Sequence, residues 1–298
     1  MNLLPLTPCY LDGAFTPLCD AKVSVMDRGF IFGDGLYEVV PAYSGVPFRF
    51  TQHMDRLERS LAEMRMSNPL RREQWHALAL QLLAHGAQAA GAAVHELDQL
   101  VYIQITRGVA MRDHAMPAGI APTVFAMANP MQQPTAEQRA RGVACVSADD
   151  FRWTKAHIKS TSLLGSVFAR QISVDAAAAE TIMFRDGFLS EAAASNVWAV
   201  KDSKVIGTPK DNLVLAGIRY GLIEEMCHSL GLGFELRKVS RAEVFGADEL
   251  LLSSATKEVL AVTTLDGQPI GSAAQRGLPG PVYAQLHAAY QRAKSAAA

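Results

Sequence analysis

Residues 152–170 read RWTKAHIKSTSLLGSVFAR, and this stretch sets a lysine, Lys159, in front of a run of hydroxyl and then apolar residues. Apolar residues at spacings of three and four indicate one face of a helix, and the hydroxyl residues 160–162 suit its N-cap. We therefore expect Lys159 near the mouth of a helix, where burial and the helix dipole disfavour an ammonium. The apolar residues are Leu163, Leu164, Val167, Phe168 and Ile172.

A lysine that is held partly neutral has the free amine that Schiff-base chemistry requires. A surface lysine ahead of a helix is nevertheless the more common explanation of such a stretch, because short motifs have a high false-positive rate. The stretch by itself leaves both interpretations open, so the rest of the chain has to decide between them.

Length and composition indicate an ordinary globular protein. A chain of 298 residues with 49% hydrophobic content is long enough for about two domains, each with its own core. The net charge of −1 gives no electrostatic basis for binding nucleic acid or an anionic membrane surface. The four cysteines show neither CxxC pairing nor a Cys/His metal spacing, so we expect reduced thiols, a cytoplasmic protein and no metal site.

One segment requires a test for a membrane span. Residues 77–94 contain no Asp, Glu, Lys or Arg over nearly the length of a transmembrane helix. The segment is rich in alanine and includes Gln81, His85 and Gln88. These residues favour a buried or amphipathic helix and no membrane partner.

The first half of the chain mixes strands with helices. Residues 51–66 have apolar side chains at helical spacing, and a second helix is expected from Arg72 into the alanine-rich segment. Alternating or β-branched runs predict strands, and they lie at 23–26, 36–43, 47–50, 101–106 and 122–127. This mixture predicts an α+β fold.

A linker is expected at 129–135, because Pro130 and Pro134 stand among polar residues and cannot continue a helix or an inner strand. The sequence therefore predicts a smaller α+β domain at 1–128 and a larger, cofactor-binding α/β domain at 136–298. Within the larger domain we expect a helix that begins near Ile218 and ends at Gly231. Strands are expected at 143–146, 180–184, 188–191, 195–200, 204–206 and 248–252.

Two segments of the second half are candidates for binding a phosphate. Gly217 precedes the helix that opens at Ile218 and Arg219, where free backbone N–H groups and the dipole favour an anion. The second segment places Ser254 and Ala255 among hydroxyl residues just after a strand. A simple turn and ordinary capping are the commoner explanations of these two patterns.

Charged residues at two further places suggest a ligand. Glu191 is followed by small residues that leave room for a flat molecule, although a solvated carboxylate at a strand end is the alternative. Arg112 and His114, in the segment RGVAMRDH, can converge on a carboxylate, with arginine providing the bidentate pair. Solvated loop charges are the alternative there.

Seven segments in a fixed order carry a resemblance to a known family. They are DRGFIFGDGLYEVV, HMDRL, YIQITRGVAMRDH, IKSTSLLG, EAAASNVWAV, LAGIRYG and DELLLSSATKEV. Together they resemble the fold-type IV pyridoxal-phosphate enzymes, and in particular the D-amino acid aminotransferases, over residues 10–265. This resemblance implies a two-domain α+β fold with pyridoxal 5'-phosphate at the domain interface.

The resemblance also assigns roles to residues. It implies that Lys159 binds the cofactor covalently and moves the α-proton, and that Glu191 faces the pyridine nitrogen and keeps it protonated. It implies that Arg56 in HMDRL pairs with the phosphate, together with the segments of Ile218, Arg219, Ser254 and Ala255. The family often has threonine at the position of Arg219 and a hydroxyl residue at that of Ala255, so backbone contacts are the ones expected there.

Substrate choice is expected to depend on Tyr37, Arg112 and His114. In the D-amino acid enzymes the matching residues hold the substrate α-carboxylate, and the Arg/His loop comes from the partner subunit of a homodimer. The resemblance thus implies ping-pong transfer of the amino group from a D-amino acid, such as D-alanine or D-glutamate, to a 2-oxo acid.

Other functions share much of this pattern. A branched-chain L-aminotransferase, an (R)-amine transaminase and an aminodeoxychorismate lyase use the same scaffold, but the branched-chain enzymes and the lyases lack the RxH loop. A non-catalytic protein that binds the cofactor or a phosphate is a different class of alternative. The presence of both Lys159 and Glu191 disfavours that class.

Overall fold

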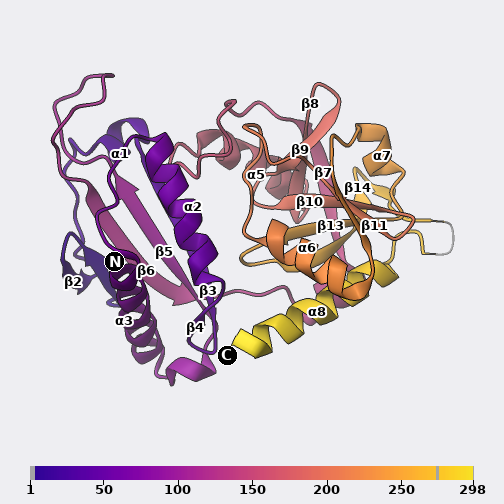
Figure 1. Ribbon diagram of the computed structural model, residues 1–298, viewed down its shortest axis with the longest axis horizontal. Helices are drawn as coiled ribbons and strands as arrows, with labels where there is room; N and C mark the ends of the chain where they lie inside the picture. Colours follow the sequence, from indigo (N-terminus) through magenta and orange to yellow (C-terminus); the bar gives the residue numbers. More distant parts are fainter. Residues whose placement is uncertain (1–3, 273–274, 298) are drawn as a thin grey trace. The chain divides into compact units, whose positions relative to one another are not determined.

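A computed structural model describes residues 4–272 and 275–297 (Figure 1). They fall into two compact units: the first extends to Met131 and also contains Ile158–Leu163, and the second comprises Gln132–His157 and Leu164–Ser295. The segment that carries Lys159 thus packs within the first unit, although it lies in the second half of the sequence. The domain boundary at 129–135 stays a prediction.

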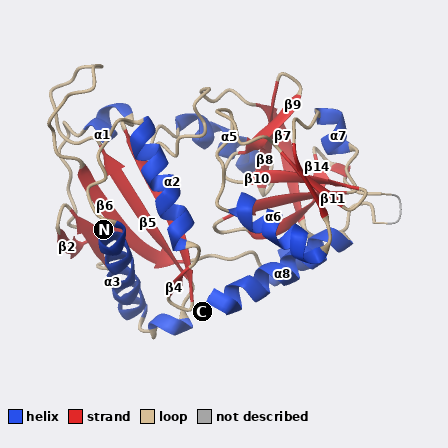
Figure 2. Ribbon diagram, in the orientation of Figure 1, coloured by secondary structure: helices blue, strands red, loops and turns tan. Residues whose placement is uncertain are grey.

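The first unit is a sheet covered on one face by two helices (Figures 1 and 2). Its strands have the order β2-β1-β6-β5-β3-β4. Leu36 and Val40 of β3 share one buried cluster with Leu57 of α2 and Leu82 of α3. The elements are β1 (Pro8–Leu11), β2 (Ala14–Pro17), α1 (Arg28–Phe32), β3 (Gly35–Tyr43), β4 (Val46–Pro47), α2 (Phe50–Glu63), α3 (Arg72–Ala90), the 3₁₀ turn η1 (Val94–Glu96), β5 (Gln99–Thr106) and β6 (Thr123–Pro130).

Most predicted elements of this unit are confirmed, including the helices now seen as α2 and α3 and the strands β3, β5 and β6. No helix within the described residues is long and apolar enough to cross a membrane. The strand expected at 23–26 is wrong, since Val23 and Val25 are exposed and no strand forms there. The strand expected at 47–50 is also wrong beyond Pro47, because α2 begins at Phe50.

The second unit is built on a mixed sheet with the strand order β12-β11-β10-β13-β14-β7-β8-β9, and β15 pairs with β14. Its core lies among β-branched and leucine side chains such as Val197, Leu250 and Val262. The elements are α4 (Ala136–Arg141), β7 (Val143–Asp149), α5 (Leu164–Asp175), β8 (Glu180–Arg185), β9 (Phe188–Ala192), β10 (Asn196–Lys201), β11 (Lys204–Gly207), α6 (Arg219–Leu230), β12 (Gly233–Leu236), α7 (Arg241–Phe245), β13 (Glu249–Ser254), β14 (Glu258–Leu265), β15 (Gln268–Pro269) and α8 (Pro281–Ala297).

The hairpin predicted at 180–191 is confirmed as β8 and β9, and α6 ends as predicted at Gly231, whose φ of 69° suits glycine. Helix α8 had no counterpart in the sequence-based prediction. It buries Leu286 and Tyr290 on one side, while its small and charged residues weaken the apolar pattern on which prediction depends.

Helix α5 is present where the sequence predicts a helix, but its large apolar side chains face away from the unit. Its buried residues are Ala169 and Ser173, whereas Leu164, Val167 and Phe168 are more than half exposed. Small side chains allow the helix to lie close to the sheet, where Ala169 packs with Met183. The apolar periodicity therefore predicts the helix correctly. The apolar face that it indicates is the exposed face of the helix in this chain.

Candidate functional site

Lys159 lies in a loop segment that is joined to the start of β3 by an isolated bridge between Ser160 and Leu36. The Tyr37 N–H donates to the Lys159 carbonyl at 2.9 Å, and the Thr161 N–H donates to the Gly35 carbonyl at 2.9 Å. The hydroxyls of Thr161 and Ser162 both donate to the Gly33 carbonyl, at 3.0 Å each. They therefore fasten the lysine segment to the α1–β3 turn, in contrast to the helix N-cap role that the sequence suggested.

The Lys159 amine faces an aromatic surface. Its Nζ is 4.2 Å from the ring centroid of Tyr37, and the rings of Tyr37 and Tyr102 stack at 5.8 Å. Burial, followed by the neighbouring Tyr37, raises the pKa of Tyr102 to about 12. The Tyr102 phenol therefore stays a neutral donor at physiological pH, and Tyr37 lies beside the lysine, as a substrate-binding role requires.

Arg56 is buried on the other face of β3. Successive strand residues point to opposite faces, and Glu38, next to Tyr37, points toward α2. The Arg56 Nε donates to one Glu38 oxygen at 2.9 Å and its Nη2 to the other at 2.5 Å. The ring of His53 lies 2.9 Å from the same carboxylate. Burial opposes ionisation of Glu38, but Arg56 and then His53 overcome it and hold the pKa of this carboxyl well below its usual range.

The predicted pair Arg112 and His114 meets on a single ring. The Arg112 guanidinium carbon lies 5.5 Å from the ring centroid of Phe32, and the His114 ring lies 5.4 Å from it. Arg28 also stacks on this ring, at 4.8 Å, and donates from Nη1 to the Asp113 carbonyl at 2.6 Å. Helix α1 therefore holds the loop that carries both side chains.

Glu191 lies on β9, is 5% exposed, and has partners at both oxygens. Arg152 donates to Oε1 at 2.6 Å, while the Asn196 amide and the Leu215 N–H each donate to Oε2 at 3.1 Å. Burial raises the pKa of Glu191 even though Arg152 acts against it. A buried carboxylate of raised pKa is a strong hydrogen-bond acceptor, which suits a role opposite a protonated ring nitrogen.

The proposed phosphate segments converge on the start of β10. Asn196 pairs with Ser253 across β10 and β13, so Ser254 and then Ala255 follow directly. On its other side Asn196 donates to the Leu215 carbonyl at 2.9 Å, and a Cβ on Gly217 would lie 2.1 Å from its Oδ1. Glycine is therefore required for the close approach that brings Ile218, the N-cap of α6, and Arg219 beside β10.

The donors of the second unit fit pyridoxal 5'-phosphate. Backbone N–H groups at the start of α6 and the Ser254 hydroxyl are ligands that phosphate accepts, and the buried Glu191 suits the ring nitrogen. The Arg219 side chain is not directed as a free phosphate ligand, because its Nε and Nη2 donate to the Tyr290 hydroxyl at 3.1 and 2.8 Å.

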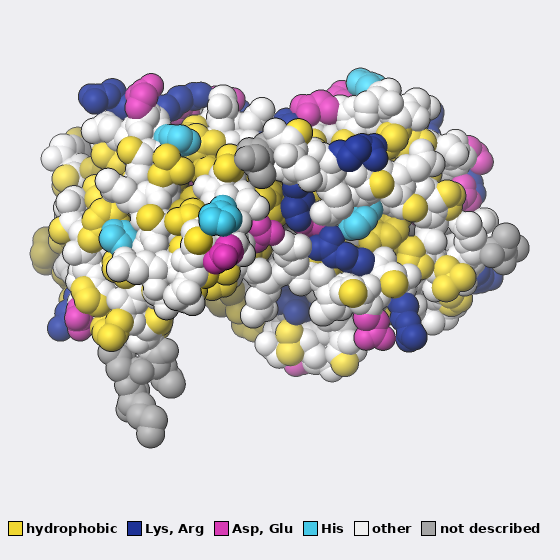
Figure 3. All heavy atoms as spheres, turned by 90° about the horizontal axis from the view of Figure 1, so that it is seen from below, with side chains coloured by type: hydrophobic (Ala, Val, Ile, Leu, Met, Phe, Trp, Pro, Cys, Tyr) yellow, Lys and Arg dark blue, Asp and Glu magenta, His cyan; other side chains and the backbone are white. Residues whose placement is uncertain are grey.

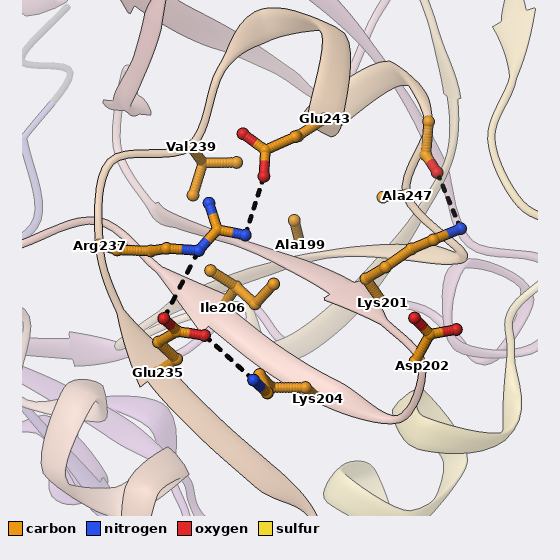
Figure 4. A pocket seen from close by; sticks show the side chains of 11 residues that line it. Ala199, Lys201, Asp202, Lys204, Ile206, Glu235, Arg237, Val239, Glu243 and Ala247 are labelled. Atoms are coloured by element: carbon orange, nitrogen blue, oxygen red, sulfur yellow. Dashed lines mark hydrogen bonds and ion pairs between the residues drawn. The ribbon is translucent and has the colours of Figure 1, made fainter.

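The second unit also contains a pocket that differs from the predicted site. A pocket over β10, β11 and β12 is bordered by ion pairs, among them Arg237 with Glu243 at 2.8 Å (Figure 4). Its lining contains no residue predicted for the site.

Histidines lie at separate places on the face drawn in Figure 3, and across the described ranges no three His, Cys, Asp or Glu side chains form a metal-binding group.

Sequence reasoning missed several residues that support the site. Arg152 stands in the opening stretch, and its spacing from Glu191 gave no signal because the two meet only when β7 and β9 flank β8. Glu38 stands between apolar residues of a strand, and the alternation of the strand places its side chain on the core face. A charged residue predicted to face the core is itself a signal that a buried partner is present. Phe32 and Tyr290 carried no pattern that indicated their partners.

Comparisons with known proteins identify the family of this chain. The model of the family described as amino-transferase class IV matches residues 35–265. The chain is 35% identical to a D-alanine aminotransferase of Bacillus licheniformis over 94% of each chain. It is 33% identical to one of Staphylococcus epidermidis, covering 96% of this chain and 98% of that protein.

Solved structures share the fold. A branched-chain amino acid aminotransferase from Escherichia coli superimposes with a TM-score of 0.79 at 23% identity, covering 95% of this chain and 92% of the other. A fold IV transaminase from Curtobacterium pusillum gives a TM-score of 0.77 at 22% identity and 92% coverage of both chains. The family match over most of the chain and the relatives above 30% identity establish that this chain belongs to the class IV aminotransferases, the fold-type IV enzymes that depend on pyridoxal 5'-phosphate.

Proposed function

We propose that this chain is a homodimeric, cytoplasmic transaminase that moves the amino group of a D-amino acid to a 2-oxo acid by a ping-pong cycle. The observation that carries the proposal is the joint packing of Arg112 and His114 on Phe32. A guanidinium and an imidazole on one ring provide adjacent donors for a carboxylate. The names of the D-alanine aminotransferase relatives support the same substrate class.

Each residue has a defined task in this proposal. When bound, the cofactor supplies the electron sink for the carbanion at the substrate α-carbon. Lys159 would anchor the cofactor through Nζ, and the same nitrogen would move the α-proton from the substrate to the cofactor. Tyr37, next to this amine, orients it through its ring. Tyr37 binds the substrate carboxylate together with Arg112 and His114, whose loop comes from the partner subunit of the homodimer. Holding the carboxylate fixes which face of the α-carbon meets Lys159.

Further residues would hold the ring and the phosphate of the cofactor in this scheme. Glu191 would keep the pyridine nitrogen protonated, and Arg152 keeps Glu191 in place. The backbone N–H groups of Ile218 and Arg219 and the Ser254 segment, which includes Ala255, hold the phosphate. Arg56 stays in the proposal as a phosphate ligand whose guanidinium is oriented by Glu38.

Homodimer formation is supported by the exposed face of α5. Leu164 is 69% exposed and Phe168 59%, and in the same unit Phe151 and Trp153 are about half exposed. Large apolar side chains that gather on a surface indicate an interface. The cytoplasmic location is supported by the four free cysteines.

Steady-state assays of D-alanine and L-leucine, each with 2-oxoglutarate, test the substrate class. We expect turnover of D-alanine and little of L-leucine; the reverse preference would replace the proposal with a branched-chain L-aminotransferase. Arg112→Ala should raise the KM for D-alanine by about 100-fold, because a bidentate carboxylate contact is lost. An unchanged KM would remove Arg112 from the carboxylate site.

A further inference from the structure

The C-terminal helix α8 lies against both segments that are proposed to hold the phosphate. Through Tyr290 it accepts two hydrogen bonds from Arg219, the first residue of α6. Through Gln291 and Lys294 it binds Glu258, the first residue of β14. Arg219 directly follows Ile218, and Glu258 follows the turn that begins after Ser254. One helix therefore contacts both sides of the proposed phosphate site from outside.

Glu258 is a strong anchor point. It is 1% exposed, and its carboxylate accepts from Arg139 at 2.9 Å, from Gln291 at 2.9 Å and from Lys294 at 2.7 Å. Its φ of 56° is in the left-handed region, which is strained for a residue that carries a side chain. The surrounding contacts have to hold this conformation, and two of them come from α8.

The other end of the same hairpin is also bound to α8. Glu249, the first residue of β13, accepts from the N–H groups of Val282 and Tyr283 at 2.8 Å each. A Cβ on Gly280 would lie 2.1 Å from the Glu249 Cδ, so glycine is needed for this close approach. Helix α8 thus spans the β13–β14 hairpin, with Glu249 at its N-terminal end and Glu258 near its C-terminal end.

Arg219 is buried together with its partner. Arg219 is 2% exposed and Tyr290 is fully buried, so their hydrogen bonds are shielded from water. Hydrogen bonds of a charged donor contribute more to stability than those between neutral groups. Because the Arg219 side chain is bound to Tyr290, we expect Arg219 to contact the phosphate through its backbone N–H, whose position the side-chain contact fixes.

We propose that α8 is a brace of the cofactor site, in which Tyr290 and Lys294 are positioning residues that set the first turn of α6 and the turn after β13 for phosphate binding. The proposal rests on the proposed function, because it takes these segments as the phosphate site. Since α8 holds the site, docking of the helix and binding of the cofactor are thermodynamically linked. The family often has threonine at the position of Arg219. In this chain Arg219 then contributes to phosphate binding through its contact with Tyr290, which positions its backbone.

The test compares four variants of the full-length protein after removal of the cofactor. Tyr290→Phe removes the acceptor of Arg219, and Tyr10→Phe is its control, because it removes a phenol hydroxyl from β1 of the first unit, where the Tyr10 ring packs on Phe15. Lys294→Met removes a charge that faces Glu258. Arg292→Met is its control, because Arg292 is exposed on the same helix.

Two readouts are measured, the dissociation constant of pyridoxal 5'-phosphate from titration of the apoprotein and amide hydrogen exchange of the apoprotein. We expect Tyr290→Phe and Lys294→Met each to raise the dissociation constant by about tenfold, as the loss of one charged hydrogen bond predicts. Tyr290→Phe should speed exchange in the first turn of α6, and Lys294→Met in residues 255–259. Both controls should stay within about twofold of the wild type.

Equal dissociation constants and equal exchange in the Tyr290 and Tyr10 variants would overturn the brace. A wild-type protein that does not bind the cofactor would instead overturn the proposed function. The exchange comparison needs no cofactor, so the bracing contacts are tested in either case. If Lys294→Met loses its folded circular dichroism, it is replaced by Gln291→Leu, which removes one hydrogen bond to Glu258 and is expected to act in the same direction.

Discussion

Arg56 and Glu38 form a buried ion pair between α2 and β3, with Nε to Oε2 at 2.9 Å and Nη2 to Oε1 at 2.5 Å. The Glu38 side chain is 1% exposed and that of Arg56 is 8% exposed. Tyr37 precedes Glu38 on the strand and faces the lysine segment. Two consecutive residues of β3 therefore connect the candidate substrate side of the sheet with the helix that carries Arg56.

Glu38→Gln should destabilise the protein by about 3 kcal/mol at neutral pH, because it leaves the guanidinium of Arg56 buried without its counter-charge. Urea unfolding of the apoprotein measures this loss. Glu58→Gln is the matched control on α2, the helix that carries Arg56. Glu58 forms a 40% exposed pair with Arg72, so the loss of stability should be much smaller.

The stability difference between wild type and Glu38→Gln should depend on pH. The pKa of Glu38 is lowered by folding, so its contribution is complete above the unfolded value of 4.5 and is lost as the pH falls below that value toward the folded pKa. The two proteins should therefore approach each other in stability below pH 4.5. A difference that is constant from neutral pH down to strongly acidic pH would contradict the ionised pair.

Phe32→Leu should impair substrate binding more than turnover. The ring supports Arg112 and His114, and a smaller side chain leaves their positions less defined, which we expect to raise the KM for D-alanine by about tenfold. Phe30→Leu is the control, because Phe30 is 72% exposed on the same short helix. Identical D-alanine kinetics in the two variants would show that the ring does not position the loop.

Arg152→Met should lower kcat by about 100-fold or more while the fold is retained. It removes the cation beside the buried Glu191, so the pKa of Glu191 rises further and the group becomes protonated, which weakens it as a partner of the ring nitrogen. Lys201→Met is the control, because the Lys201 cation belongs to a separate ion pair with Asp248 at 2.8 Å. Rescue of kcat by Arg152→Lys would support the charge as the cause.

The regular parts of the fold could be predicted from sequence where pattern and burial coincide. Helix α2 is an example, because Met54, Leu57 and Leu61 all face the core at helical spacing. Prediction failed where apolar residues are not buried within the chain, as at Val25 and Phe168. A hydrophobic pattern reports which side chains avoid water, and a partner surface can satisfy that requirement as well as the core does.

The candidate site could be predicted one residue at a time, but not as a network. The prediction for Lys159 comes from its motif. Glu38, Arg152 and Tyr290 act through partners that are distant in sequence and are brought close only by strand order and helix packing. These residues act through paired charges and buried hydroxyls, and such contacts do not recur at a regular spacing along the sequence. The positioning contacts of a site are therefore harder to predict than the residues that carry its chemistry.

The central claim, transfer of an amino group from a D-amino acid, is tested most directly by a single turnover of the cofactor-loaded protein. The protein is mixed with D-alanine or L-alanine in the absence of any 2-oxo acid, and the pyruvate released is measured. We predict about one pyruvate per bound cofactor with D-alanine, almost none with L-alanine, and none from Lys159→Ala with either enantiomer. Equal or faster release from L-alanine would contradict the account.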